Sequence, residues 1–296
     1  MASSVDFGDI QGLVRFGYPR MTEACYLLGK AKNASAVRAW LTNAPITSAV
    51  KLQQPPKTAL QIAFTREELE ALGVPKNVIA GFSAEFISGV ATDENRSRRL
   101  GDTGANSPSN WQWGTAGKVP HAVVMLFAEP GLLNAWKYSI KGEFWNAAFE
   151  EIACLPTSDM DGREPFGFID GISQPEIDWE QNRKVPINGN EREYRNTVCL
   201  GEFLLGYRNE YGRYTDRPLL DPQDRAGSEL PFAEDQPGKK DLGRNGTYVV
   251  MRQLAQDVRG FWQFLDKATN SNPDERRKLS GYMVGQIGRA SCRERV

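Results

Sequence analysis

The stretch Ala122-Val123-Val124-Met125-Leu126-Phe127-Ala128 is the longest apolar run in the chain. It is far too short to cross a bilayer, so it indicates a strand buried inside a sheet. Gly131 to Phe149 follows it and supplies a segment of helical length. The sequence therefore predicts a sheet in which a strand leads into a helix that packs back on it.

The same alternation of strand and helix precedes this stretch. Glu23 to Ala31 and Thr58 to Phe64 have the pattern of strands, and Ala34 to Thr42 between them has helical spacing. Thr65-Arg66-Glu67-Glu68 has the pattern of a capping box, which starts a further helix that we expect to stop at Gly73. Strands separated by helices predict an α+β fold built from βαβ units.

The order repeats near the end of the chain. Gly246 to Gln253 is predicted to be a strand and Gln256 to Lys267 a helix, which indicates two related α+β units. The long segment from Leu155 to Gly243 is loop-rich, as functional segments often are. We expect an N-terminal domain over residues 1–150 and a C-terminal domain over residues 151–286.

Composition excludes several classes of protein. The 296 residues are 40% hydrophobic and 25% charged, as in a packed globular protein. With 36 basic and 37 acidic residues, no net field recruits nucleic acid or an anionic membrane as a partner. The N-terminus has no secretion signal, so we expect a cytoplasmic protein. Reduced thiols, with neither a zinc site nor a disulfide frame, are expected at the scattered Cys25, Cys154, Cys199 and Cys292.

The loop-rich segment contains one chemically distinctive stretch, Glu164-Pro165-Phe166-Gly167-Phe168-Ile169-Asp170-Gly171-Ile172-Ser173-Gln174-Pro175. It places Asp170 between two glycines, which allow close approach to a ligand, and among apolar side chains. Desolvation would raise the pKa of such a carboxyl and make it a useful general base. The alternative is an Asp-Gly turn in which Asp170 bonds its own backbone, and the residues alone favour that turn.

The amino-acid sequence of this stretch resembles the Gly-x-x-Asp-Gly fingerprint of the dye-decolorizing (Dyp-type) haem peroxidases. The resemblance covers about residues 6 to 286. It implies two ferredoxin-like α+β domains of the dimeric α+β barrel type, with haem b held in the second. Three further stretches look like parts of the family: Asp9-Ile10-Gln11-Gly12, Leu100 to Gly114 with its Trp-Gln-Trp-Gly ending, and Gly201 to Gly212.

By this resemblance Asp170 is the distal acid/base. It would take a proton from hydrogen peroxide and return it to the leaving oxygen, giving a ferryl species that oxidises dyes, phenols or similar electron donors. An aspartate works as a base in acid, where a histidine would be charged, so the family resemblance implies an acidic optimum. The same resemblance implies that the haem is lined by Phe168, Gly171, Ile172 and Ser173.

The histidine that ligates haem iron in the family lies downstream of the fingerprint, in a Gly-Ala-His-Ile-Arg-type motif, and a distal arginine follows it. This sequence has neither, so no metal ligand is assigned. His121, the chain's one histidine, heads a strand of the first domain and is interpreted as an ordinary strand-end residue. We therefore expect the second domain to be incomplete and the chain as written to be an inactive fragment.

The final stretch, Ile287 to Val296, has no apolar period and translates a sequencing-adapter read in one frame. We expect it to be a non-native tail, so that the genuine sequence is cut near Gln286 and its gene continues. A basic, disordered tail is the alternative.

Two rival functions stay open beside the peroxidase. One is a haem-free ferredoxin-like module that binds a small molecule or dimerises, and the other is a related haem enzyme such as a chlorite-decomposing one, against which Asp170 argues. A homo-oligomer is also open. Arg96, Arg98 and Arg99 are interpreted as a solvated loop. Five aromatic residues could either pack under the loops or relay electrons to bulky dyes, and packing is favoured: Trp111, Trp113, Tyr207, Tyr211 and Tyr214.

Overall fold

The computed structural model describes residues 5–158, 160, 163–167, 175–182 and 196–293, with only the backbone from residue 284 onward. The chain divides into two compact units. Residues 5–158 and 175–249 belong to the first, termed the sheet unit, and the other described residues belong to the second, the helical unit. The expected domain boundary after residue 150 stays a prediction about the whole protein.

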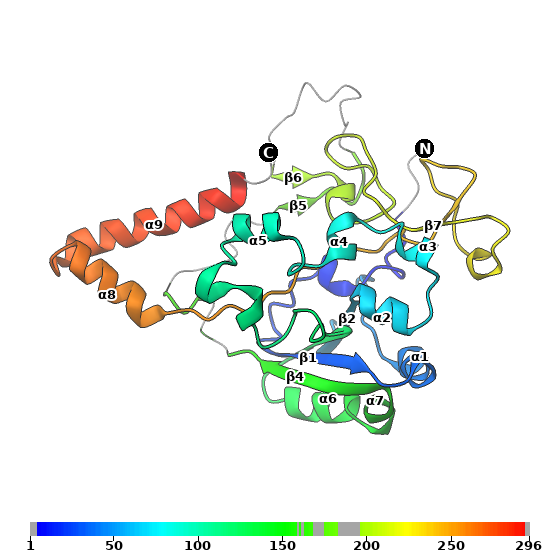
Figure 1. The fold of residues 1–296 in the computed structure, drawn as a ribbon, viewed down its shortest axis with the longest axis horizontal. Helices are drawn as coiled ribbons and strands as arrows, with labels where there is room; N and C mark the ends of the chain where they lie inside the picture. The colour runs from blue at the N-terminus through cyan, green and yellow to red at the C-terminus, as the bar shows by residue number, and fades with distance from the viewer. Residues whose placement is uncertain (1–4, 159, 161–162, 168–174, 183–195, 294–296) are drawn as a thin grey trace. The chain divides into compact units, whose positions relative to one another are not determined.

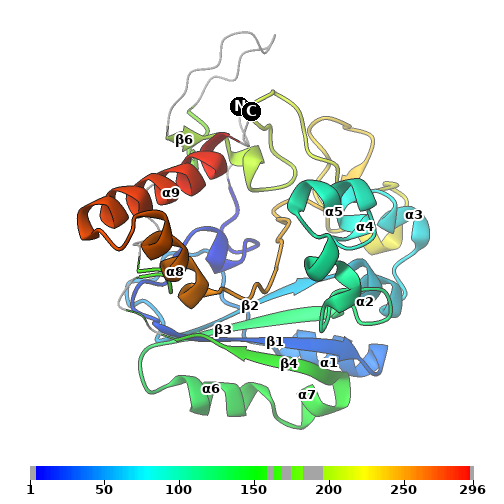
Figure 2. The ribbon, with the colours of Figure 1, turned by 60° about the vertical axis from the view of Figure 1, so that its left-hand side comes forward.

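The sheet unit is built on four strands, β1 (Glu23–Ala31), β2 (Thr58–Phe64), β3 (Ala122–Ala128) and β4 (Phe149–Pro156). The sheet lies at the base of the view in Figure 1, and the order of its strands, β2-β3-β1-β4, can be followed in Figure 2. Each neighbouring pair is antiparallel. Strands β1 and β2 are therefore parallel with β3 between them, and β3 and β4 are parallel with β1 between them. Two interleaved βαβ crossovers of this kind make the ferredoxin-like α+β arrangement that the sequence predicts.

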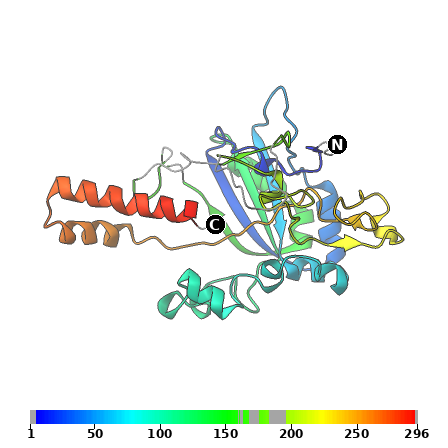
Figure 3. The ribbon, with the colours of Figure 1, turned by 90° about the horizontal axis from the view of Figure 1, so that it is seen from above.

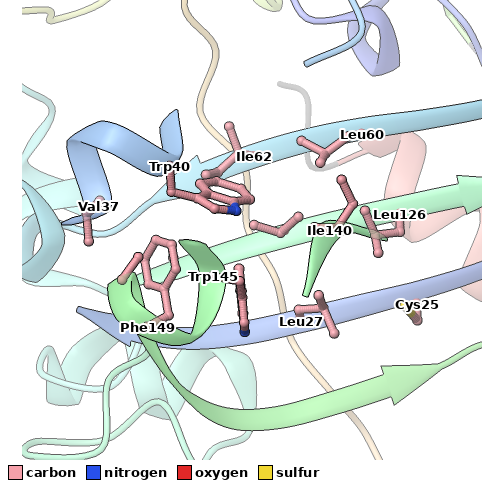
Figure 4. Close-up of a cluster of buried hydrophobic side chains, with 13 residues drawn as sticks. Cys25, Leu27, Val37, Trp40, Leu60, Ile62, Leu126, Ile140, Trp145 and Phe149 are labelled. Carbon is pink, nitrogen blue, oxygen red and sulfur yellow. The ribbon is translucent and has the colours of Figure 1, made fainter. Parts of the chain in front are cut away.

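Helices cover one face of this sheet. They are α1 (Ala34–Asn43), α6 (Leu133–Ile140) and α7 (Glu143–Ala148) (Figure 2). Asn33 starts α1, because its side-chain oxygen accepts from the backbone N–H groups of Ser35 and Ala36. The core between helices and sheet is formed by side chains that include those labelled in Figure 4: Cys25, Leu27, Val37, Trp40, Leu60, Ile62, Leu126, Ile140, Trp145 and Phe149.

The helix predicted over Gly131 to Phe149 is two helices, and the strand β4 that follows them was not predicted. Helix α6 ends at Ile140, Lys141 is its C-cap, and Gly142 takes an extended conformation before α7. Strand β4 carries Glu150 and Glu151 in its exposed part. Only one side of β4 is paired within the described sheet, and Glu151 pairs with Lys141 at 2.8 Å. These two charged residues hide the apolar pattern of a strand.

The connection from β2 to β3 is a long helical insertion. Helix α2 ends where the sequence predicts, since Gly73 two residues later has a φ of +79°. The insertion contains α2 (Arg66–Ala71), α3 (Lys76–Ile79), α4 (Ala84–Ser88), α5 (Glu94–Leu100) and the 3-10 turns η2 (Gly104–Asn106) and η3 (Pro108–Asn110).

The rest of the sheet unit is loop-rich, as predicted for Leu155 to Gly243. Its described strands are two residues long and form two small ladders, one parallel and one antiparallel. These are β5 (Glu176–Ile177) with β6 (Thr197–Val198) and β7 (Leu219–Leu220) with β8 (Lys240–Asp241). Single 3-10 turns complete it: η1 (Gly12–Val14), η4 (Leu200–Glu202) and η5 (Arg225–Gly227).

The helical unit contains α8 (Val258–Ala268) and α9 (Pro273–Arg293), which lie side by side (Figure 3). Helix α8 confirms the predicted helix within two residues at its N-terminus. No helix in the described part of the chain is both long and apolar enough to cross a bilayer.

The strand predicted over Gly246 to Gln253 is wrong. These residues form no β-ladder, and the side chains of Val249 and Val250 are 50% and 75% exposed. An alternating apolar pattern becomes a strand only when another strand accepts its backbone hydrogen bonds. None of the described strands pairs with this segment.

The outer edge of β2 is closed by the side chain of Gln11. Gln11 Nε2 donates to the carbonyl of Ile62 at 2.8 Å, and the Ile62 N–H donates to Gln11 Oε1 at 2.8 Å. One amide side chain therefore pairs with the edge as a neighbouring strand would. Gln11 belongs to the Asp9-Ile10-Gln11-Gly12 stretch, so this part of the family resemblance has a structural role.

We expect Gln11→Ala to lower the free energy of unfolding by about 2 kcal/mol, because two half-buried backbone groups lose their partners. Urea denaturation measures the change. Gln53→Ala, at an exposed position in the loop before β2, is the control and should leave stability unchanged. Equal effects of the two variants would contradict this role for Gln11.

Candidate functional site

The residues proposed for chemistry, Asp170 with Phe168, Gly171, Ile172 and Ser173, lie outside the described residues. The structure describes what holds the fingerprint on each side, at 163–167 and 175–182. The upstream flank belongs to the helical unit and the downstream flank to the sheet unit. The chain passes between the two units after residue 158, at the end of the fingerprint after residue 174, and after residue 249.

The upstream flank is fixed to helix α8 by aromatic packing. The rings of Phe166 and Phe261 have centroids 4.9 Å apart. Gly167 then turns the chain with a φ of +89°, a conformation that side chains disfavour although open space surrounds this position. Arg163 Nη1 donates to the Gly167 carbonyl at 3.1 Å and supports this turn.

The downstream flank is fixed by the parallel pairing of β5 with β6 and by Trp179. The rings of Trp179 and Phe7 have centroids 5.3 Å apart. The guanidinium of Arg15 lies 3.8 Å from the centre of the Phe7 ring and donates to the Ala49 carbonyl at 2.9 Å. This stacking ties the segment that follows the fingerprint to the N-terminal end of the chain.

Two of the stretches that carry the family resemblance meet in one buried cluster. Tyr207 is 2% exposed, and its hydroxyl donates to Asn245 Oδ1 at 2.7 Å. Asn245 Nδ2 in turn donates to Asp9 Oδ2 at 2.9 Å. The cluster thus joins Asp9-Ile10-Gln11-Gly12 to the stretch from Gly201 to Gly212. Its buried side chains are Ile10, Ala49, Leu200, Leu204 and Tyr207.

Gly201 is required in this cluster by close backbone approach. A Cβ atom at this position would lie 2.3 Å from the carbonyl carbon of Arg208. The Gly201 N–H donates to the Arg208 carbonyl at 3.1 Å, which closes the turn that carries Tyr207. The glycine that opens this motif therefore serves packing within the described structure.

A buried arginine that the sequence analysis missed organises the loops beyond this cluster. Arg217 has a side chain 3% exposed, and its Nε donates to Asp241 Oδ2 at 2.7 Å. Its terminal nitrogens donate to both carboxylate oxygens of Asp235. Burial would lower the pKa of Arg217, but these hydrogen bonds outweigh it and raise that pKa. Nothing in the sequence around Arg217 distinguished it from a surface arginine.

His121 lies at the start of β3, as the sequence predicts, and its ring is engaged with the protein. The Ala31 N–H donates to His121 Nδ1 at 3.3 Å. Burial lowers the pKa of His121, Lys30 lowers it further, and Glu67 opposes the shift.

Glu68 faces this imidazole, and its role differs from the predicted one. The expected capping box does not form, because the Thr65 hydroxyl donates to the carbonyls of Pro120 and His121 and makes no cap hydrogen bond. Glu68 is instead fully buried, and its Oε2 lies 3.2 Å from His121 Nδ1. Burial raises the pKa of Glu68 to about 7. The Thr-x-x-Glu spacing therefore placed Glu68 correctly on the first turn of α2 and misassigned its function.

The described residues do not fit a haem group. The single histidine of the chain is held between a backbone N–H and a buried carboxyl. No cluster of three or more potential metal ligands occurs among the described residues. Within the described residues the imidazole of His121 is thus engaged with Ala31 and Glu68, and is not presented to a cofactor.

The remaining candidates are tied into local structure. Arg98 and Arg99 lie in the last turn of α5, where positive charge suits the helix dipole, and Arg96 pairs with Asp93. They are on a helix and not in the predicted loop. Trp111 Nε1 donates to the Asn106 carbonyl at 2.9 Å. Trp113 and Tyr214 are half-buried, and Tyr211 is 46% exposed. Relay roles for these aromatic residues stay predictions.

Known proteins similar to this chain are dye-decolorizing peroxidases of fungi. The chain is 28% identical to dye-decolorizing peroxidase msp1 of Mycetinis scorodonius, over 91% of its own length and 47% of that protein. It is 31% identical to a dye-decolorizing peroxidase of Exidia glandulosa, over 96% of its own length and 52% of that protein. No family model matches the chain. The chain spans about half the length of the curated relatives that it matches.

Solved structures agree on the fold. An ancestral D-type dye-decolorizing peroxidase superposes with a TM-score of 0.61 at 22% identity, covering 90% of this chain and 53% of that one. The peroxidase of Auricularia auricula-judae gives a TM-score of 0.53 at 23% identity, covering 72% of this chain and 46% of that one. The α+β fold class and the resemblance to the Dyp-type family are thus confirmed.

We expect Arg217→Met to lower the free energy of unfolding by about 3–5 kcal/mol, because it leaves the buried Asp241 carboxylate without its cation. Chemical denaturation followed by tryptophan fluorescence measures the loss. Arg213→Met, at an exposed position of the same loop region, is the matched control and should change stability little. If the Arg217 variant were as stable as the parent, the ion pairs of Arg217 with Asp235 and Asp241 would not contribute to stability.

Proposed function

We propose that the protein from which this chain derives is a haem-dependent peroxidase of the Dyp type, which uses hydrogen peroxide to oxidise dyes, phenols or similar organic donors. The observation that carries the proposal is the fingerprint from Glu164 to Pro175, which lies in a chain whose curated relatives are dye-decolorizing peroxidases. The ordered series of motifs around the fingerprint supports it, because a single Gly-x-x-Asp-Gly match would be weak.

Asp170 is the acid/base of the proposed reaction. Its carboxylate would take a proton from hydrogen peroxide and return that proton to the leaving oxygen. A carboxylate remains ionised at a pH where imidazole is already charged, so the chemistry suits acidic conditions. The apolar neighbours Phe166, Phe168 and Ile172 would keep water from competing for this proton.

The haem b would supply the capacity to remove electrons one at a time from a donor. By the family resemblance Phe168, Gly171, Ile172 and Ser173 would line it. The iron ligand would come from residues that this chain does not contain, because the imidazole of His121 is engaged between Ala31 and Glu68. We therefore propose that the chain as written is inactive as a peroxidase.

A haem-free ferredoxin-like module for small-molecule binding or dimerisation is the second candidate. The observation that favours it is the completeness of the sheet unit, whose core of aromatic and aliphatic side chains needs no cofactor. The outer edge of β4 has no partner among the described strands and could accept a second copy.

In a longer protein that contains this chain and binds haem, Asp170→Asn is expected to lower kcat/KM for hydrogen peroxide by about 10²–10⁴-fold, because general acid/base catalysis is lost. Stopped-flow mixing of peroxide with the loaded enzyme measures this rate, and the Soret absorption confirms that haem is retained. The control is Asp221→Asn, an exposed loop carboxylate 62% accessible in its side chain. A normal rate in the Asp170 variant would refute the assignment.

The 296-residue chain itself is expected to develop no sharp Soret band with added hemin and to show no peroxidase turnover, because its sole imidazole is engaged. Absorption spectra and a dye-bleaching assay test this directly. Light scattering on the same sample separates the two candidate functions, since a haem-free dimer favours the binding module. A Soret band with turnover would contradict the proposed inactivity.

A further inference from the structure

The position of one backbone N–H fixes the protonation of the His121 ring. The Ala31 N–H, at the end of β1, donates to His121 Nδ1 at 3.3 Å. A nitrogen that accepts this hydrogen bond carries no proton of its own, so the proton of the neutral imidazole resides on Nε2. The sheet therefore selects a neutral ring in one tautomer.

The fully buried carboxyl group of Glu68 lies against Nδ1 of this ring, the nitrogen that carries the lone pair. Its Oε2 lies 3.2 Å from Nδ1, and neither of its oxygens receives a hydrogen bond. An ionised carboxylate here would be buried without a donor and would face a second electron pair. A proton on the carboxyl removes both penalties at once.

We propose that Glu68 and His121 form a proton latch, a neutral carboxylic acid beside a neutral imidazole that docks helix α2 on the sheet in acidic solution and releases it in mildly alkaline solution. The other charged groups that face the pair are Lys30 on β1 and Glu67 on α2. Glu67 is already held by Arg66 at 2.8 Å. Lys30 acts on His121, whereas burial is what raises the pKa of Glu68, so neither group supplies Glu68 with a counter-charge.

The latch controls α2 because Glu68 is the buried residue of that short helix. The start of the helix is held independently, since the Thr65 N–H donates to the His121 carbonyl at 2.9 Å. When Glu68 loses its proton, there are two outcomes. Either the carboxylate moves out to water, or the proton passes to Nδ1 of His121 and leaves a carboxylate beside an imidazolium. The first route undocks α2, and the second displaces the Ala31 N–H from the ring.

Folding moves a proton from one member of the pair to the other. At mildly acidic pH the unfolded chain carries ionised Glu68 and charged His121, whereas in the proposed latch the folded chain carries both groups neutral, in keeping with the raised pKa of Glu68 and the lowered pKa of His121. Over the pH range in which both groups differ in protonation between the folded and the unfolded chain, the pair binds the same number of protons in both states. Stability therefore does not change with pH in that range on account of this pair.

Taken alone, Glu68 and His121 would change the stability of the fold with pH in opposite directions. The raised pKa of Glu68 means that its contribution is full below pH 4.5 and is lost as pH rises toward about 7. The lowered pKa of His121 means that its contribution is full above pH 6.5 and is lost as pH falls. In both cases the folding equilibrium changes by about tenfold per pH unit within the window.

The first test needs no substitution, because His121 is the only histidine in the chain. Nitrogen-15 NMR of the folded chain at pH 5.5 is expected to show one neutral ring with its proton on Nε2, although free imidazole is largely charged at this pH. An imidazolium signal, or a proton on Nδ1, would overturn the proposal.

The second test separates the two slopes with three variants of the full chain. Relative to the double variant, Glu68→Gln should lose stability as pH falls below 6.5, and His121→Asn should lose stability as pH rises from 4.5 to about 7. The parent should show no net slope, relative to the double variant, over the pH range in which the two single-variant slopes overlap. Glu70→Gln, on the exposed side of the same helix, should behave as the parent. Parallel curves for Glu68→Gln and His121→Asn would refute the exchange of a proton on folding.

The release of α2 is tested by hydrogen exchange of amides 66–72, corrected for the intrinsic effect of pH. The parent should lose protection in α2 above pH 7 while α1 stays protected, and Glu68→Gln should keep α2 protected throughout. If the parent kept α2 protected at pH 8.5, the pair would not act as a latch.

Discussion

Backbone groups that are removed from water must find partners, and this requirement determines which parts of the chain become sheet. Strand β1 lies between β3 and β4 and satisfies both of its sides with backbone. Strand β2 has only β3 on one side, and Gln11 pairs with Ile62 on the other. The segment from Gly246 to Gln253 contains the apolar run Tyr248 to Met251, but none of the described strands pairs with it, and it forms no strand. Hydrogen-bond partners, more than hydrophobic pattern, thus distinguish the sheet from the segments that resemble it.

The same requirement explains which elements could be predicted from the sequence. The strands Glu23–Ala31, Thr58–Phe64 and Ala122–Ala128 are buried on the helix-covered face, so their apolar residues report their position directly. Strand β4 was missed because its exposed glutamates resemble a helix surface. Gly246 to Gln253 was overpredicted because local sequence contains no information about whether a partner strand is present. Long-range pairing is the quantity that short windows cannot report.

The candidate site was predictable to an unequal degree. Asp170 was proposed as the acid/base only because the sequence around it resembles the Dyp-type fingerprint. The residue types alone favoured a simple Asp-Gly turn. Glu68 was seen but interpreted as a helix cap, because the pattern Thr-x-x-Glu is the same whether the glutamate turns to the helix end or to His121. Arg217 gave no signal at all, since its two aspartates come from residues 235 and 241 and meet it only in the folded chain. Residues whose role depends on a distant partner are those that sequence reasoning missed.

Buried charge is handled in two ways in the sheet unit, and the difference bears on the working pH. Arg217 keeps its charge because the carboxylates of Asp235 and Asp241 compensate it. Burial raises the pKa of Asp235, but Arg217 lowers it by more, so this ion pair fails in acid only once Asp235 takes up a proton. Glu68 has no cation within reach of its oxygens, so a proton must compensate it, and that arrangement fails in alkali. The two requirements overlap only in mildly acidic to neutral solution. An acid/base at Asp170 has to be ionised in the same range, so the conditions that favour the proposed chemistry are those in which both buried sites of the scaffold are compensated.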